Sequence, residues 1–269
     1  LNLTEKVLEE AWWGADFLHR VLSDEGYFYT TIFDQWGRDP NRYITGYEGI
    51  HGKYTPNYQA AFREGGGVAI AALARAARLA SSLGAGGEFS ASQYRADAIR
   101  AFDHLLAHNS EYCKDGKENI IDDYTALLAA VELFRTTHEQ DYLEYARSRA
   151  DSLESRIAEE GHFIADDGER PFYHAVEAGF PVVSLLHYHD IESDEARRQR
   201  VLLAIARSLD HQLKLDSGSA NPYDYPRQEF QTYDFNTGVG TSERLTGFFI
   251  PHDSLGPGSI RAISAGRLR

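Results

Sequence analysis

Ala69-Ile70-Ala71-Ala72-Leu73-Ala74 is the stretch of sequence that decides the fold, because a similar face recurs twice later in the chain. The later copies read Ala126-Leu127-Leu128-Ala129-Ala130-Val131 and Leu202-Leu203-Ala204-Ile205-Ala206. Small residues on such faces allow helices to pack closely. Recurrence of one supersecondary unit is typical of stacked arrays, so the sequence predicts stacked helical hairpins.

Around these copies, apolar residues recur at three- and four-residue steps, which is the period of an amphipathic helix. Thr4 is the expected N-cap of the first helix, and Gly26 follows its end. Seven helices with short connections predict an all-α protein, and at 269 residues an α/α toroid fits better than a four-helix bundle. The expected helices span residues 4–22, 62–83, 91–109, 119–137, 139–159, 174–190 and 194–214.

Two segments lack the helical period. Residues 26–58 are rich in aromatic side chains and predict a long loop with a short hairpin at 27–33. Long ordered loops are often functional, so this one either forms a ligand surface or fills the edge of the core. Residues 216–253 are rich in Asn, Pro, Tyr and Gly and are expected to be loop-like.

The charge balance of the chain limits the partners that can be expected. Lys and Arg number 27 against 41 Asp and Glu, a formal net charge of −14. Nucleic acids and anionic membranes reward clustered basic residues, so neither is expected as a partner. There is also no apolar run of about 18 residues that would span a membrane. The lone Cys113 cannot form an internal disulfide, which leaves the compartment open.

The common cofactor and metal motifs are not matched. Gly238-Val239-Gly240 has Glu243 where a dinucleotide fingerprint needs its third glycine. His187 and His189 are two positions apart on an expected helix and so face different sides. No cofactor and no metal are therefore expected.

Two segments at expected helix starts each have a structural and a functional interpretation. Gly65-Gly66-Gly67 either permits close backbone packing at a crowded turn, which is favoured, or binds an anion. Asp122-Asp123 is interpreted as helix capping in preference to catalysis, because carboxylates stabilise a helix start.

Two late segments have the composition of a polar-ligand pocket. Residues 221–228 read Asn-Pro-Tyr-Asp-Tyr-Pro-Arg-Gln, and residues 248–253 read Phe-Phe-Ile-Pro-His-Asp. Tyrosine faces stack on the C–H faces of sugar rings, while Arg, Gln, His and Asp form hydrogen bonds with hydroxyl groups. A well-packed loop with surface tyrosines is the equally favoured alternative.

Several segments of the sequence resemble those of a known family. Trp13-Gly14-Ala15-Asp16-Phe17-Leu18 is similar to the Trp-Gly-Ala-Asp helix of glycoside hydrolase family nine, the inverting cellulases and their relatives. The resemblance runs from about residue 4 to Asp253. Two further segments of the resemblance are Asn221-Pro222 with Tyr225, and Pro251-His252. A third, Phe62-Arg63-Glu64-Gly65-Gly66-Gly67-Val68-Ala69 with Tyr225-Pro226-Arg227-Gln228, resembles the branch that includes exo-β-glucosaminidases more than the plain endoglucanases.

The resemblance implies an (α/α)6 barrel of helical hairpins and hydrolysis of β-1,4 bonds by an inverting single displacement. In that mechanism an Asp activates water and a distant Glu protonates the leaving oxygen. The family's Asp precedes the Trp-Gly-Ala-Asp helix, where this sequence begins, and no Glu follows Asp253. We therefore expect a partial domain over residues 1–253, an atypical, disordered or frame-shifted tail over 254–269, and low or no activity of this chain alone.

No catalytic residue is carried over from the resemblance. The residues expected to bind substrate are Trp36, Arg63, Tyr223, Tyr225, Arg227, Gln228, His252 and Asp253. Arg63 has an alternative role, pairing with a carboxylate at a helix end. The expected partner is an oligosaccharide or polysaccharide, with the oligomeric state left open.

Two other functions stay open. One is a sugar epimerase or isomerase on the same toroid, with His174, His187 and His189 as acid and base groups. The other is a non-catalytic carbohydrate-binding remnant.

Overall fold

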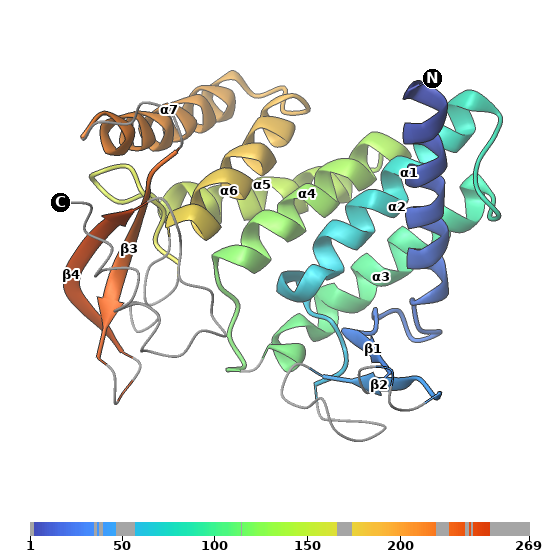
Figure 1. Ribbon diagram of the computed structural model, residues 1–269. Helices are drawn as coiled ribbons and strands as arrows, with labels where there is room; N and C mark the ends of the chain where they lie inside the picture. Colours follow the sequence, from blue (N-terminus) through green and yellow to red (C-terminus); the bar gives the residue numbers. More distant parts are fainter. Residues whose placement is uncertain are drawn as a thin grey trace. The chain divides into compact units, whose positions relative to one another are not determined.

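Helices make up most of the described chain, as the recurring Ala/Leu faces predict (Figure 1). The computed structural model describes residues 3–34, 37, 40–46, 57–113, 115–165, 174–218, 226–234, 237 and 239–247. The chain divides into two compact units, Leu1–Arg149 and Ala150–Arg269. Among the described residues, no helix is both long enough and apolar enough to cross a membrane.

The first unit is a set of helices with one small hairpin. Helices α2 and α4 are its inner pair, because α2 packs against both α3 and α4 and every residue from 122 to 133 in α4 is buried. A helix that is buried all round belongs to the core. The elements are α1 (Leu3–Arg20), β1 (Thr31–Phe33), β2 (Tyr43–Thr45), the π-helical turn η1 (Phe62–Gly66), α2 (Gly67–Leu83), α3 (Ala91–Tyr112), α4 (Ile120–Thr137) and α5 (Gln140–Ser155), which runs into the second unit.

Helices α2 and α4 run parallel, and their backbones are in close contact at Gly67 and Thr125. A Cβ atom added to Gly67 at the start of α2 would lie 2.6 Å from Cβ and 2.7 Å from the carbonyl carbon of Thr125 on α4. Further along, Arg78 of α2 reaches Thr136 of α4, so early residues meet early residues and late meet late. The close-packing interpretation of the glycine run is therefore confirmed at Gly67.

A buried carboxylate joins the far ends of the same helices. Glu132 of α4 is fully buried and accepts hydrogen bonds from Arg75 at 3.0 Å, Arg78 at 2.8 Å and Arg135 at 2.9 Å. Burial alone would raise the pKa of Glu132, but hydrogen bonds and charge from Arg75 and Arg78 outweigh it, and the pKa is lowered. A charge buried in a core must be paired, so this group fixes the register of α2 on α4.

Asp16, from the motif that carried the family resemblance, has a structural role. Its buried carboxylate accepts hydrogen bonds from the backbone N–H of Glu88 at 3.0 Å and from the Tyr94 hydroxyl at 2.5 Å. Burial alone would raise the pKa of Asp16, but these hydrogen bonds outweigh it and the pKa is lowered. The carboxylate therefore ties α1 to the start of α3.

The aromatic segment of residues 26–58 divides between core and surface. Tyr27 and Phe28 are buried, so the core-edge alternative is correct for these two, whereas Tyr29 and Tyr58 are half-buried. The observed hairpin pairs β1 with β2, so it begins later and extends further than the hairpin expected at 27–33.

One turn occurs twice, after α1 and after α5. In the first copy Ser23 N donates to Tyr27 O at 2.9 Å, and Leu22 forms a bridge with Phe28. In the second copy Ala158 N donates to His162 O at 2.9 Å, and Ile157 forms a bridge with Phe163. The recurrence that the helical faces predict thus extends to the connections.

A glycine with positive φ lies at the same place in each copy of this turn. Gly26 has φ +111, and an added Cβ would lie 3.0 Å from the Arg100 carbonyl oxygen of α3. Gly161 has φ +106, and an added Cβ would lie 2.4 Å from the Arg207 carbonyl oxygen on the helix that follows in the second unit. Each turn therefore packs closely against the backbone of a helix, α3 in the first copy and the helix that carries Arg207 in the second.

The second unit contains a helix pair and a two-stranded antiparallel ribbon. Strand β3 packs on both helices and pairs with β4, with Glu229 opposite Thr246. The elements are α6 (His174–His189), α7 (Glu195–Ser217), β3 (Gln228–Tyr233) and β4 (Gly240–Gly247).

All seven expected helices are confirmed, with shifts at their ends. Helix α5 ends at Ser155 instead of 159, and Thr4 lies inside α1 instead of before it. The loop-like assignment of residues 216–253 was wrong over β3 and β4, because these strands carry few β-branched residues and lack regular apolar alternation. The predicted tail 254–269 lies outside the described residues.

Gly67→Ala should destabilise the protein by about 1–3 kcal/mol, because the new Cβ forces the inner helices apart. Gly14→Ala is the matched control, since a Cβ at that helical position meets nothing within 4 Å. The control should be neutral or stabilising by about 1 kcal/mol, because alanine favours helix. Urea denaturation measures both, and equal effects of the two variants would contradict the close contact.

Candidate functional site

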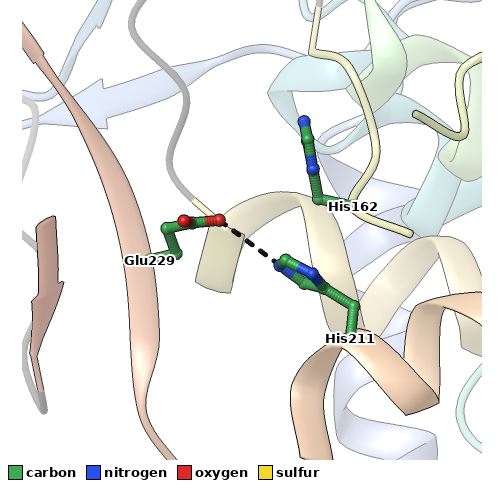
Figure 2. A group of neighbouring side chains, drawn as sticks. All are labelled: His162, His211 and Glu229. Atoms are coloured by element: carbon green, nitrogen blue, oxygen red, sulfur yellow. Dashed lines mark ion pairs between the residues drawn. The ribbon is translucent and has the colours of Figure 1, made fainter. Parts of the chain in front are cut away.

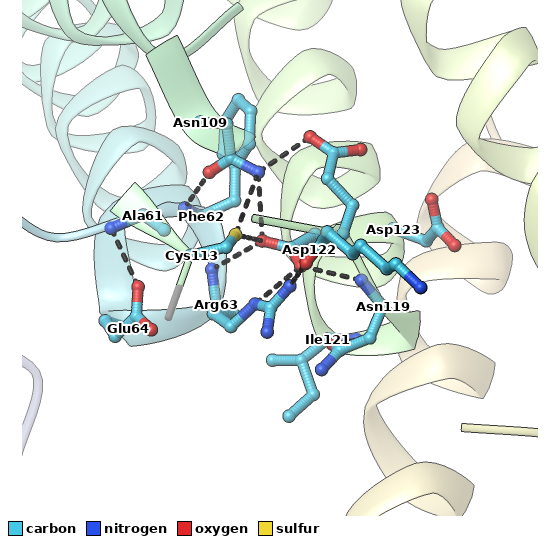
Figure 3. Close-up of polar contacts among 12 residues, drawn as sticks. Ala61, Phe62, Arg63, Glu64, Asn109, Cys113, Asn119, Ile121, Asp122 and Asp123 are labelled. Atoms are coloured by element: carbon cyan, nitrogen blue, oxygen red, sulfur yellow. Dashed lines mark hydrogen bonds and ion pairs between the residues drawn. The ribbon is translucent and has the colours of Figure 1, made fainter. Parts of the chain in front are cut away.

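The starts of the two inner helices bring a group of polar side chains together (Figure 3). Turn η1 leads into α2, and residues 115–119 lead into α4. Within η1, Gly65 has φ +108, and a Cβ at Gly66 would lie 2.8 Å from the Ala61 carbonyl oxygen. Irregular π-type turns are frequent at functional sites, which makes this end of the unit a candidate.

Arg63 in η1 is held by partners from its own chain. Its Nε donates to Asp122 at 2.7 Å, one terminal nitrogen donates to the Lys117 carbonyl, and the other lies 3.6 Å from Asp115. Burial alone would lower the pKa of Arg63, but the charge and hydrogen bond of Asp122 together with the other acidic groups nearby, Asp115 among them, outweigh it and the pKa is raised. This is the pairing with a helix-end carboxylate given as the alternative role, and substrate binding by Arg63 stays a prediction.

Asp122 is the fully buried centre of this group. It accepts hydrogen bonds from the Arg63 side chain, from Asn109 Nδ2 at 3.0 Å and from the Asn119 backbone N–H at 2.9 Å (Figure 3). The last contact closes a capping box at the start of α4, so the capping interpretation is confirmed. The neighbouring Asp123 pairs with Arg149 at 3.0 Å.

Glu64 is in a different environment from Asp122. It is half-buried, lies on the side of the turn away from Asp122, and accepts a hydrogen bond from the Ala61 backbone N–H at 2.9 Å (Figure 3). Burial raises its pKa. A carboxyl group with a raised pKa and access to solvent can exchange a proton or bind a hydroxyl group.

The segment that enters η1 also carries an aromatic pair. Tyr58 and Tyr29 stack with ring centroids 6.4 Å apart, and both are half-buried. Backbone hydrogen bonds from Thr30 N to Tyr58 O and from Ala60 N to Phe28 O, each 2.8 Å, hold the two segments together. Half-buried aromatic rings near a polar turn are suited to contact a sugar ring.

Sequence reasoning singled out neither Glu64 nor the tyrosine pair as ligands. Glu64 is part of the segment that resembles the family but has no role there, and the two tyrosines belong to the aromatic segment of residues 26–58. The available signal was a carboxylate directly before three glycines, since such a run marks a turn that departs from a regular helix.

The other predicted binding residues are only partly covered. Arg227 lies just before β3, where its backbone N–H donates to Asp216 at 2.6 Å and its carbonyl accepts from Gln212 at 2.9 Å. Gln228 begins β3. The residues outside the described part of the chain are Trp36, Tyr223, Tyr225, His252 and Asp253.

A comparison with solved structures identifies the class of fold. The chain is similar to an unsaturated glucuronyl hydrolase specific for heparin, with a TM-score of 0.51 and 14% sequence identity. The match covers 88% of this chain and 53% of that one, so the chain spans about half the length of the glucuronyl hydrolase. This likeness shows the fold, an α/α toroid of helical hairpins, as the sequence predicts.

The family is shown by the sequence. The model of Glycosyl hydrolase family 9 matches residues 1–218, and the chain belongs to that family. A search of curated proteins found no relative.

Asp122→Ala should cost about 3–5 kcal/mol of stability, because it leaves Arg63 and Asn109 without their buried acceptor. Asp115→Ala is the matched control, since Asp115 faces the same guanidinium but its side chain is 61% exposed. The control should change stability by no more than about 1 kcal/mol. Equal losses in urea denaturation would show that Asp122 does not hold the turn.

Glu64 should make stability depend on pH. Its folded pKa is raised above the ordinary 4.5, so its contribution is fully present below pH 4.5 and is lost as pH rises through the folded pKa. Glu64→Gln removes this loss while keeping an acceptor for Ala61 N. The Tm of the variant minus that of the wild type should therefore increase between pH 4 and pH 7. A difference that is constant with pH would mean that Glu64 titrates as if it were in water.

Proposed function

We propose that the protein hydrolyses β-1,4-glycosidic bonds in polysaccharides or oligosaccharides, either cellulose and β-glucan or chitosan-derived chains, by an inverting mechanism. The observation that carries this proposal is the match of residues 1–218 to Glycosyl hydrolase family 9. The helical hairpin fold supports it as well.

The carboxylates at the starts of α2 and α4 divide into two kinds. An inverting hydrolase needs a carboxylic acid and a carboxylate base on opposite sides of the scissile bond. The oxygens of Asp122 already accept hydrogen bonds from Arg63, from Asn109 and from the backbone N–H that caps α4, so Asp122 is not suited to either role. Neither the acid nor the base is assigned to a described residue of this chain.

Glu64 is given a binding role in this proposal. Its half-buried carboxyl group would form a hydrogen bond with a sugar hydroxyl, and the Tyr29–Tyr58 pair would contact a ring face. Substrate binding by the eight residues predicted from sequence is also part of this proposal. The net charge of −14 would attract glucosamine oligomers more than neutral ones, so the two substrate classes should differ in their salt dependence.

The test uses cello-oligosaccharides and chitosan oligosaccharides with the purified chain. Calorimetry should detect binding of at least one class, and Glu64→Ala should weaken it about 10-fold, as expected for loss of a hydrogen bond to a charged group. Asp115→Ala, which removes a more exposed carboxylate near the same turn, should bind like the wild type. Absence of binding by both classes would overturn the proposal.

Product analysis tests the reaction itself. Each cleavage should add one water and release the α-anomer first. Release of the β-anomer would contradict inversion. Products of unchanged mass would favour the epimerase alternative, and binding with no turnover at high enzyme concentration would favour the carbohydrate-binding remnant.

A further inference from the structure

Two histidines and a glutamate meet in the second unit (Figure 2). His162 lies in the turn after α5, His211 on α7 and Glu229 on β3. One ligand atom from each residue lies within 4.8 Å of the others. The three residues are far apart in the chain, which is why no metal motif could be recognised in the sequence.

The backbone holds the two histidines together. His162 belongs to the second copy of the repeated turn, in which Gly161 is pressed against the backbone of α7. The Arg207 guanidinium of α7 adds a hydrogen bond to the Ala158 carbonyl at 2.8 Å. His162 and His211 are only 4% and 7% exposed, and their ring centroids lie 5.5 Å apart.

Strand β3 supplies the third group. The Glu229 carboxylate lies 3.3 Å from Nε2 of His211, the ion pair drawn in Figure 2, and its side chain is 15% exposed. The contacts of the Arg227 backbone with Asp216 and Gln212 anchor the start of β3 on α7. Each of the three groups is thus positioned by a different element.

The first copy of the same turn provides an internal comparison. There Tyr27 takes the place of His162 and His104 takes the place of His211, with ring centroids 5.7 Å apart. The turn therefore packs well on a tyrosine–histidine pair. The second copy replaces the tyrosine by a histidine and adds a carboxylate, and both changes supply metal-ligand atoms.

We propose that His162, His211 and Glu229 bind a divalent transition-metal ion of the Zn²⁺ class. Two imidazoles and one carboxylate form a known zinc ligand set, with the fourth position left to water. Ligands about 2.0–2.1 Å from a tetrahedral ion lie about 3.3 Å apart, which is the distance between His211 and Glu229. The ligand atoms all lie within 4.8 Å of one another, so bringing them to this spacing requires a movement of at most about 1.5 Å. This inference does not depend on the proposed glycosidase function.

Other charged groups border the cluster. Arg244 of β4 contacts His162 Nε2 at 3.0 Å and Nδ1 at 3.3 Å, and lies 3.6 Å from Glu229. Its side chain is 38% exposed, so it can turn toward solvent when an ion takes its place. The exposed Glu160 lies 3.9 Å from His162 Nδ1. Burial, with Arg244 and His211 nearby, lowers the pKa of His162 to about 4, so its imidazole is neutral near pH 7, as a metal ligand must be.

Zinc titration of the metal-free chain by calorimetry tests the proposal. One ion should bind per chain, and Tm should rise with Zn²⁺ concentration because the metal binds the folded state. His162→Tyr copies the first turn and should keep the fold while weakening binding at least about 10-fold, as loss of a ligand costs no less than loss of its supporting hydrogen bond. His108→Ala, which removes an exposed histidine of the first unit, should bind Zn²⁺ like the wild type.

Arg244→Gln separates a metal site from a simple polar network. In a metal site, removing the neighbouring positive charge should tighten Zn²⁺ binding about 3-fold or more. In a polar network, the same variant would only lower Tm. The visible spectrum of bound Co²⁺ gives a second readout, and its tetrahedral bands should be lost in His162→Tyr. Absence of stoichiometric Zn²⁺ binding, or binding unchanged in His162→Tyr, would overturn the proposal.

Discussion

The contact between Gly67 and Thr125 is the constraint on which the first unit depends. It sets the distance between α2 and α4, and two groups of buried charge then fix how far one helix can slide along the other. Asp122 meets Arg63 at the start of the pair, while Glu132 meets Arg75 and Arg78 at the far end. A slip of one turn would separate Asp122 from Arg63 and Glu132 from Arg75 and Arg78, and breaking each buried pair would cost several kcal/mol.

This arrangement also decides where chemistry can occur. Asp122 satisfies the backbone and side chains around it, so its negative charge serves the fold. Glu64 lies in the turn η1, whose backbone departs from helical geometry before α2 begins. Its side chain therefore stays partly exposed to solvent. Family membership therefore indicates the expected reaction. The difference in burial indicates that Asp122 has a structural role and that Glu64 can contact a ligand.

Much of the architecture could be predicted because it depends on local pattern. The Ala/Leu faces predict the helices and the toroid, and the position of Asp122 at a helix start predicts its capping role. Strands β3 and β4 could not be predicted, because their polar sequence takes its structure from the packing of β3 on α6 and α7 and from the pairing of β4 with β3. The His162–His211–Glu229 cluster could not be predicted either, since three elements must fold before it exists. A comparison of the sequence with itself could have aligned Gly26-Tyr27-Phe28 with Gly161-His162-Phe163.

The repeated turn has a consequence for how the sequence can evolve. Every missense change at Gly26 or Gly161 introduces a side chain, and that side chain would collide with the backbone of α3 or α7 and require a disfavoured backbone angle. These two codons are therefore closed to neutral drift, whereas the exposed Asp24 and Glu159 beside them can vary. The residue after each glycine is where the two copies can diverge without loss of the turn.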